Sequence, residues 1–182
     1  MTRINSTLPV AVDLTIPGVS AQKSVLPILN RHTGAVLLEV EYLQGADLAL
    51  SHLQDADLAR AVLICTVLRG CNLVGASLYR ANLNGAWLQG ADLHRADASE
   101  ASFAHAKLEY AHLDQVDLRG ANLQEADLSR ARLHTADLRA TRLLGANLND
   151  TDLTTCRLEG ALFDEQTRWR GLRATSVRGA GR

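Results

Sequence analysis

The sequence predicts an all-β solenoid whose backbone turns at every fifth residue. From Ala46 to Glu165 the chain divides into 24 consecutive blocks of five residues without an insertion or deletion. The third residue of the block is Leu in 21 blocks, and the first residue is Ala in 17. The second residue is Asp or Asn in 12 blocks, so apolar and polar positions recur with one period.

A period of five residues fits neither a regular helix nor a flat strand. Each residue of an α-helix advances by about 100°, so Leu at every fifth position would spread over all sides. In a flat strand, successive Leu would point to opposite faces, because five is an odd number. A chain that bends once per block avoids both problems. In such a chain the first and third residues of each block face inward. The corner then falls near the fifth position, where Gly is found in several blocks and suits a tight turn.

The pattern Ala-(Asp/Asn)-Leu-x-x resembles the pentapeptide-repeat family over residues 46–165. Typical blocks read Ala-Asp-Leu-His-Arg at 91–95 and Ala-Asn-Leu-Gln-Glu at 121–125. The resemblance implies a right-handed quadrilateral parallel β-helix with four blocks per coil and about six coils. The resemblance also implies a protein without catalytic activity, because many members of this family have no known catalytic role.

Two segments precede the repeat. Residues 1–24 are interrupted by Pro and Gly and are interpreted as an N-terminal arm that either lies on the coils or is disordered. Residues 25–45 are expected to form a β-hairpin cap, because two apolar runs flank the turn sequence Asn30–Gly34. Such a cap is needed because the first coil of a solenoid otherwise exposes its core and a strand edge.

Residues 166–182 follow the repeat and are expected to form a C-terminal cap and a basic tail. The stretch FDEQTRWRGL at 163–172 resembles the terminal segment of many bacterial family members, and Trp169 is the expected plug of the last coil. Charge is unevenly distributed along the chain. The repeat carries 17 acidic and 11 basic side chains, whereas residues 166–182 carry five Arg and no acidic residue.

The composition narrows the class of protein. The chain has 182 residues, a formal net charge of -1 and three Cys, and it has no CxxC pair. These features favour a cytoplasmic protein over a secreted one with a disulfide framework. No signal peptide and no run of about 18 apolar residues is recognised, so membrane contact is not expected. The small net charge also argues against direct contact with nucleic acid.

No motif indicates catalysis. The sequence contains no phosphate-binding loop, no GxSxG and no HExxH, so we expect neither an enzyme nor a cofactor or resident metal. In a 20-residue register His94, Asp114 and His134 stack together, and they are the best candidates for a surface metal site or a pH-sensitive contact. The other interpretation is a solvated checkerboard of opposite charges.

Apolar side chains at outward positions are the first candidate for a partner-binding surface. They are Val62, Ile64, Val67, Val74, Trp87 and Tyr110. An exposed apolar patch usually marks a contact. Two interpretations stay open: residues 1–24 cover the cluster on the first two coils, or a partner or second copy docks there with Trp87 as an anchor.

An acidic column is the second candidate surface and contains Asp97, Asp117 and Asp137. Stacked like charges repel one another unless they are neutralised. Arg119 and Arg139 lie two residues after two of these carboxylates and are expected to neutralise them. The column is therefore either a balanced, solvated face or a strip that receives a basic partner, such as the Arg-rich tail of another copy.

The sequence thus predicts a non-enzymatic scaffold for protein–protein interaction, and a homodimer is one possible assembly. The alternative, implied by the family resemblance, is a DNA-mimicking protein that binds and protects DNA gyrase or topoisomerase IV. The chain departs from those family members in three respects. Its repeat is only weakly acidic, its C-terminal tail is basic, and no projecting loop interrupts the coils.

Overall fold

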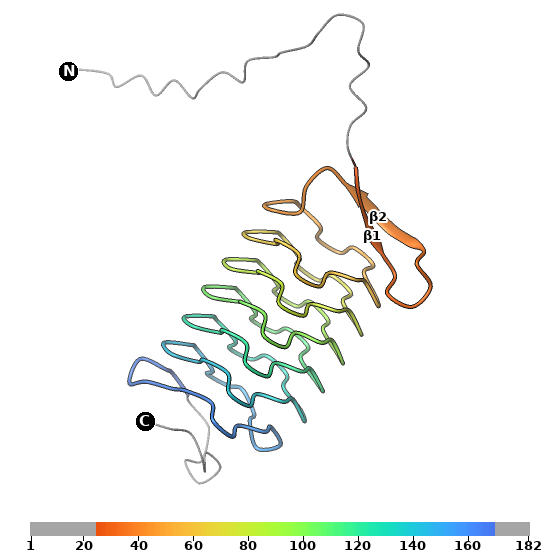
Figure 1. Cartoon of the computed structure of the whole chain (residues 1–182). Coiled ribbons are helices and arrows are strands. Elements are labelled where there is room, and N and C mark those ends of the chain that lie inside the picture. The colour runs from red at the N-terminus through yellow and green to blue at the C-terminus, as the bar shows by residue number, and fades with distance from the viewer. Residues whose placement is uncertain (1–24, 170–182) are drawn as a thin grey trace, which may run out of the picture.

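The structure, a computed structural model, describes residues 25–169 and shows a β-helix preceded by a short hairpin (Figure 1). The coils are stacked along one axis, and the hairpin stands at the N-terminal end of the stack. Residues 25–169 contain no helix that could span a membrane. The predicted arm of residues 1–24 and the predicted tail from residue 170 onward lie outside the described part of the chain.

Each coil contains 20 residues, because parallel β-bridges join residues that are 20 positions apart. One such ladder runs through Val67, Trp87 and Lys107. The Trp87 amide donates to the Thr66 carbonyl at 2.9 Å, and the Leu68 amide donates to the Trp87 carbonyl at 2.7 Å. Four blocks of five residues therefore form one coil, and second-position residues of successive coils stack in columns.

The first and third residues of the blocks fill the inside of the β-helix. All third-position residues from Leu48 to Leu158 are buried, and Phe103 is the largest of the fully buried side chains. Burial of one Leu contributes about 1.5–3 kcal/mol before the entropy cost, so the central Leu columns are the main source of stability. First-position polar residues such as Thr66 are also accommodated, because the buried hydroxyl donates to the Leu43 carbonyl at 2.6 Å.

Each corner is a β-turn, and in nearly every block its fifth-position residue has a positive φ. The amide that opens the next block donates to a third-position carbonyl, as from Ala56 to Leu53 at 3.1 Å. Gly90 has a φ of 65°, and Ala140 has a φ of 56°. Because the left-handed region is unfavourable for residues with a Cβ, corners such as Ala140 carry backbone strain.

The frequent Asp or Asn at the second position has a structural cause that the sequence pattern did not reveal. Its side-chain oxygen accepts a hydrogen bond from the backbone amide two residues later. Asp92 accepts the His94 amide at 3.0 Å, and Asn122 accepts the Gln124 amide at 3.1 Å. Such local bonds favour turns, so the second-position residue prepares the chain for the following corner.

The hairpin before the coils consists of β1 (Leu26–Leu29) and β2 (Val36–Val40), which pair antiparallel. Asn30 opens the connecting turn, and its side-chain oxygen accepts two backbone amides at 3.0 Å each. The hairpin joins the first coil through the Asp57 amide, which donates to the last carbonyl of β1 at 2.7 Å. Ile28 is buried and connects the hairpin to the core.

The C-terminal end of the stack is closed by the residues that follow the last block. Arg168 forms a β-bridge with Asn147, so this step of the ladder spans 21 residues instead of 20. The preceding residue, Thr167, is buried. The Trp169 ring lies 4.5 Å from the Phe163 ring between centroids and packs against the core, as expected for a plug.

Candidate protein-interaction surface

One side of the β-helix carries exposed or half-buried apolar side chains where the repeat usually has polar residues. We call this side the aromatic strip and define it by Leu50, Val67, Trp87 and Tyr110. Val67 and Trp87 are neighbours in one β-ladder, and Leu50 and Tyr110 occupy the corner that follows this ladder. Leu50 is 73 % exposed and Tyr110 is 54 % exposed, so both corner residues of the strip are accessible to solvent.

Trp87 is held between two cations. The guanidinium carbon of Arg69 lies 4.3 Å from the indole centroid, and the Lys107 Nζ lies 4.7 Å from it. Arg69 belongs to the preceding coil and Lys107 to the following coil, and Arg69 also donates to Gln89 at 3.3 Å. Each cation–π contact at an exposed site contributes about 0.5–1 kcal/mol. The indole is therefore oriented by the chain itself before any partner binds.

Tyr110 is oriented in a similar way by Arg130. The guanidinium carbon of Arg130 lies 5.5 Å from the ring centroid, and one of its nitrogens donates to the phenol oxygen. Arg130 in turn pairs with Asp150 at 3.4 Å. The strip thus combines oriented aromatic rings with cationic side chains that lie over them.

Leu50 is a member of the strip that was not predicted from the sequence. It occupies a fifth position, where Gly and polar residues prevail, so an apolar residue there was a usable signal. A Cβ added at Gly70 would lie 2.8 Å from the Leu50 Cδ2. Leu50 therefore leans over the next coil, and the glycine below it makes room for the side chain.

The other predicted apolar residues do not join this strip. Val62 is 50 % exposed and bridges Asn82, and the half-buried Ile64 lies on the same side. Val74 follows Asn72, which belongs to yet another ladder. The cluster expected on the first two coils is therefore divided over three sides of the β-helix.

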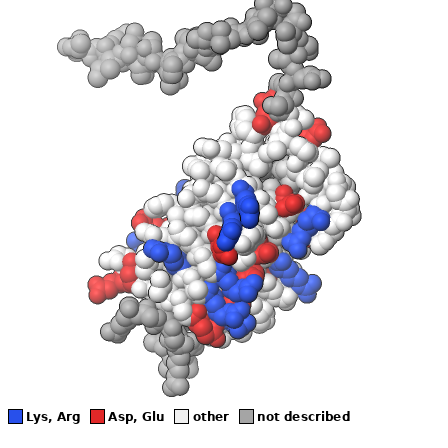
Figure 2. Space-filling view, viewed as in Figure 1, with Lys and Arg blue, Asp and Glu red and all other residues white. Residues whose placement is uncertain are grey.

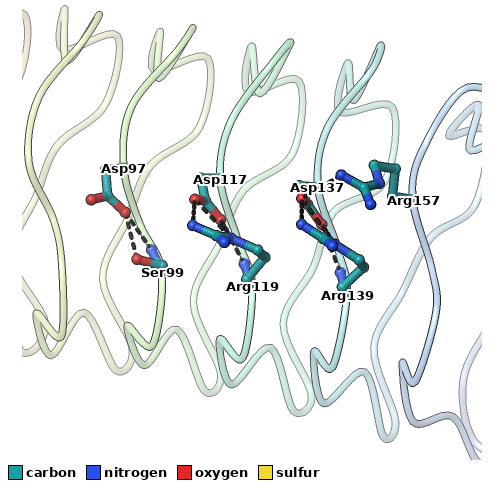
Figure 3. A network of polar contacts seen from close by, with 7 residues as sticks. All are labelled: Asp97, Ser99, Asp117, Arg119, Asp137, Arg139 and Arg157. Atoms are coloured by element: carbon teal, nitrogen blue, oxygen red, sulfur yellow. Dashed lines mark hydrogen bonds and ion pairs between the residues drawn. The ribbon is translucent and has the colours of Figure 1, made fainter.

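The acidic column is largely neutralised by the chain's own arginines (Figure 3). Arg119 pairs with Asp117 and Arg139 pairs with Asp137, each with a closest distance of 2.6 Å, as expected from their spacing. Arg157 adds a second contact to Asp137 at 3.5 Å. The hydrogen bond from Arg139 holds the pKa of Asp137 below its ordinary value, and these pairs raise the pKa of Arg119 and Arg139.

Asp97 is the remaining member of the column. Its carboxylate accepts the Ser99 amide at 3.0 Å and the Ser99 hydroxyl at 2.6 Å (Figure 3). The column therefore becomes more negative toward Asp97, where hydroxyl and amide donors replace the arginines. A basic partner would meet an uncompensated carboxylate at this member rather than along the whole column.

The third predicted group, His94, Asp114 and His134, is organised by other contacts. The Asp114 carboxylate pairs with Arg132 at 2.9 Å and accepts the His134 amide at 3.0 Å. The His134 ring lies 3.3 Å from the Thr155 hydroxyl. Within residues 25–169, no group of three His, Cys, Asp or Glu is placed to hold a metal ion.

The three cysteines differ in exposure. Cys71 and Cys156 occupy inward first positions, and burial raises the pKa of both thiols to about 12. Cys65 is exposed at a corner. Cys65 is therefore the most accessible of the three thiols, whereas Cys71 is buried and Cys156 is half-buried.

Charges of both signs are intermingled on the surface. Figure 2 shows Lys and Arg next to Asp and Glu on the face in view, so no large area of one sign forms there. The number of charges also changes along the axis. Residues 46–85 contain 6 charged side chains, whereas residues 106–145 contain 12. The coils that carry Leu50 and Val67 are thus the less charged part of the stack.

Comparisons with known proteins agree with the geometry of the coils. The chain matches the family described as Pentapeptide repeats in eight copies, which together span about two thirds of its length. The matched segments are residues 42–78, 76–109, 99–134 and 131–165. A comparison with curated protein sequences finds no match.

Several solved structures are similar to this chain. The pentapeptide repeat protein alr5209 from Nostoc PCC 7120 is 35 % identical, with a TM-score of 0.49, over 50 % of this chain and 77 % of its own. HetL, a pentapeptide repeat protein involved in heterocyst differentiation regulation in Nostoc sp. PCC 7120, is 30 % identical, with a TM-score of 0.32, over 67 % of this chain and 70 % of its own.

A trypsin-treated variant of QnrB1, a plasmid-mediated fluoroquinolone resistance protein, shares the fold. It is 17 % identical, with a TM-score of 0.50, and the match covers 76 % of this chain and 84 % of that protein. The five-residue blocks, the ladders that join residues 20 apart and the family match lead to one conclusion: this chain belongs to the pentapeptide repeat family.

Proposed function

We propose that this chain is a non-enzymatic protein-binding scaffold whose aromatic strip docks on a protein partner. In this proposal the β-helix is right-handed, has about six coils, and serves as a rigid rod that presents the strip. The observation that carries the proposal is the gathering of Leu50, Val67, Trp87 and Tyr110 on one side, at positions where the repeat otherwise favours polar residues. Exposed apolar patches of this kind mark contact surfaces.

The composition of the strip supports binding to protein. Trp, Tyr and Arg are the residue types that contribute most to protein interfaces. Arg69 and Lys107 already orient Trp87, and Arg130 already orients Tyr110. Because these rings lose little freedom on binding, more of the contact energy becomes affinity.

The acidic column is the less suitable of the two surfaces. Asp117 and Asp137 are paired with arginines of the same chain, so a basic partner would have to replace contacts that already exist. Ion pairs at a protein surface contribute at most about 1 kcal/mol, and their exchange brings little net affinity. A cytoplasmic location is also part of the proposal, since a reducing compartment keeps the exposed Cys65 thiol free.

A quantitative capture experiment tests the proposal. The full chain and two variants are used as bait in lysate of the source organism, and bound proteins are quantified by mass spectrometry. Trp87→Ala removes the oriented indole and should weaken binding of the partner by about 30-fold or more, which corresponds to about 2 kcal/mol for a central interface residue. Asp117→Ser combined with Arg119→Ser is the matched control on another side and should retain the partner. Equal loss in both variants, or no loss in Trp87→Ala, would contradict the proposal.

Protection of DNA gyrase or topoisomerase IV is the alternative function. Its support is the family and the fold that the chain shares with QnrB1. The intermingled charges of Figure 2 and the internal Asp–Arg pairs speak against mimicry of a polyanion. A gyrase supercoiling assay with a fluoroquinolone separates the two functions. Rescue of supercoiling by this protein would favour the alternative, and absence of both binding and rescue would remove it.

A further inference from the structure

An apolar groove of about 460 Å³ lies at the N-terminal end of the β-helix, between the hairpin and the first coil. We call it the N-terminal groove. It is lined by residues 26–28 of β1, by residues 42–44 after β2, and by parts of 57–62 in the first coil. Leu26, Tyr42 and Val62 at its rim are 47 %, 63 % and 50 % exposed. Apolar side chains gathered around a hollow indicate a contact surface.

The groove also contains an open position in the backbone ladder at Val62, beside the bond from the Gly45 amide to the Ile64 carbonyl at 2.9 Å. In later coils, the second-position amide donates to the preceding coil, as Asn82 does to the Ala61 carbonyl at 2.9 Å. Val62 holds the same position one coil earlier, and within residues 25–169 its amide donates to no carbonyl. Tyr42 stands 20 residues before Val62, yet no β-bridge joins these two described residues. An open ladder position beside an apolar hollow is suited to accept an added strand.

Residues 8–16 of the same chain have the sequence pattern of such a strand. Apolar side chains occupy every second position, namely Leu8, Val10, Val12, Leu14 and Ile16. The positions between them hold Pro9, Ala11, Asp13 and Thr15. A strand with this period places one apolar face against the groove and a face of small or polar residues toward solvent. Proline is tolerated in edge strands, so Pro9 is compatible with this placement.

The connection to the described structure is short. Residues 17–24 separate this segment from Val25, which directly precedes the groove-lining Leu26. Eight residues span at most about 28 Å, so the segment can reach the groove from its point of attachment. A tether of this length also gives a local concentration in the millimolar range, which favours this segment over a separate peptide or a second copy.

We propose that residues 8–16 add as a β-strand at the Val62 edge and bury their apolar face in the N-terminal groove of the same molecule. The added strand pairs the open backbone edge and covers the rim formed by Leu26 and Tyr42. The cap of the β-helix is then made of three strands instead of two. This inference is independent of the partner proposed for the aromatic strip.

Amide hydrogen exchange of the full chain tests this inference. Val12→Asp combined with Leu14→Asp places two charges on the apolar face of the segment. The matched variant, Ala11→Asp combined with Thr15→Asp, places the same charges on its other face. We expect the Val62 amide to exchange about tenfold faster in the first variant and at the wild-type rate in the second. Amides of residues 106–145 report whether the β-helix stays folded, and they should exchange equally in all three proteins.

Two results would overturn the inference. One is an equal exchange rate of the Val62 amide in the wild type and in the variant with a charged apolar face. The other is protection of Val62 that rises with protein concentration and is accompanied by a dimer in sedimentation, because a second copy would then supply the strand. Neither result depends on whether Trp87→Ala affects binding of a partner, so the two proposals can fail separately.

Discussion

Removing one methyl group at a strained corner should stabilise this protein. Ala140 is exposed and has a φ of 56°, and its replacement by Gly removes little more than the Cβ. The left-handed conformation costs a residue with a Cβ about 1–2 kcal/mol. Gly loses more conformational freedom than Ala on folding, which costs about 0.5–1 kcal/mol. The difference predicts that Ala140→Gly raises the free energy of unfolding by about 0.5–1 kcal/mol.

Two further variants should change stability in the opposite direction. Ala49 is exposed at a fourth position and is not among the residues with positive φ, so Ala49→Gly should lower stability by about 0.5–1 kcal/mol. Gly90 has a φ of 65°, and a Cβ added there meets no atom within 4 Å. Gly90→Ala therefore adds strain without a clash and should lower stability by about 0.5–1 kcal/mol.

Chemical denaturation followed by far-ultraviolet circular dichroism measures these three changes. In thermal unfolding, a change of 1 kcal/mol corresponds to about 2–4 °C for a domain of this size. The reasoning is refuted if Ala140→Gly and Ala49→Gly lower the free energy of unfolding by the same amount. It is also refuted if Gly90→Ala leaves stability unchanged, because the positive φ would then carry no cost.

Three other predictions concern the core, the ion pairs and the thiols. Leu88 is fully buried, so Leu88→Ala should lower the free energy of unfolding in urea by about 2.7–5 kcal/mol, and a loss below 1 kcal/mol would contradict the packing argument. Asp137→Asn should lower stability at pH 7 by about 1 kcal/mol, because it removes the negative charge that pairs with two arginines. The native pKa of Asp137 is below the ordinary value of 3.8. The stability difference between the wild type and Asp137→Asn should therefore persist above pH 3.8 and vanish as the pH falls through the native pKa. A stability difference that is independent of pH would show that charge is not its cause. A maleimide at pH 8 should label Cys65 alone in the folded protein. The reason is that pKa values of about 12 leave only about one in 10⁴ of the Cys71 and Cys156 thiols ionised. Mass spectrometry that shows two or three labels without unfolding would contradict these raised pKa values.

Some surface features could be predicted from sequence and others could not. The pairing of Asp117 with Arg119 follows from a spacing of two residues within one block, and the structure confirms it. The contacts of Trp87 with Arg69 and Lys107 join three different coils, so their prediction requires the register between coils as well as the side-chain conformations. The division of the apolar cluster over three sides shows the same limit, because neighbours in the sequence turn away from one another at each corner.

The five-residue period of the sequence by itself determined the interior of this protein. A chain with Leu at every fifth position can bury these side chains only if it bends at every block. It also determined that Ala and Leu form the core, since hydrophobic burial depends on residue type and local spacing. Only the tertiary structure decided which outward side chains meet, because their partners lie about 20 residues away in neighbouring coils. It also decided the opening between the hairpin and the first coil, since no β-bridge joins Tyr42 to Val62, although the Gly45 amide still donates to the Ile64 carbonyl at 2.9 Å.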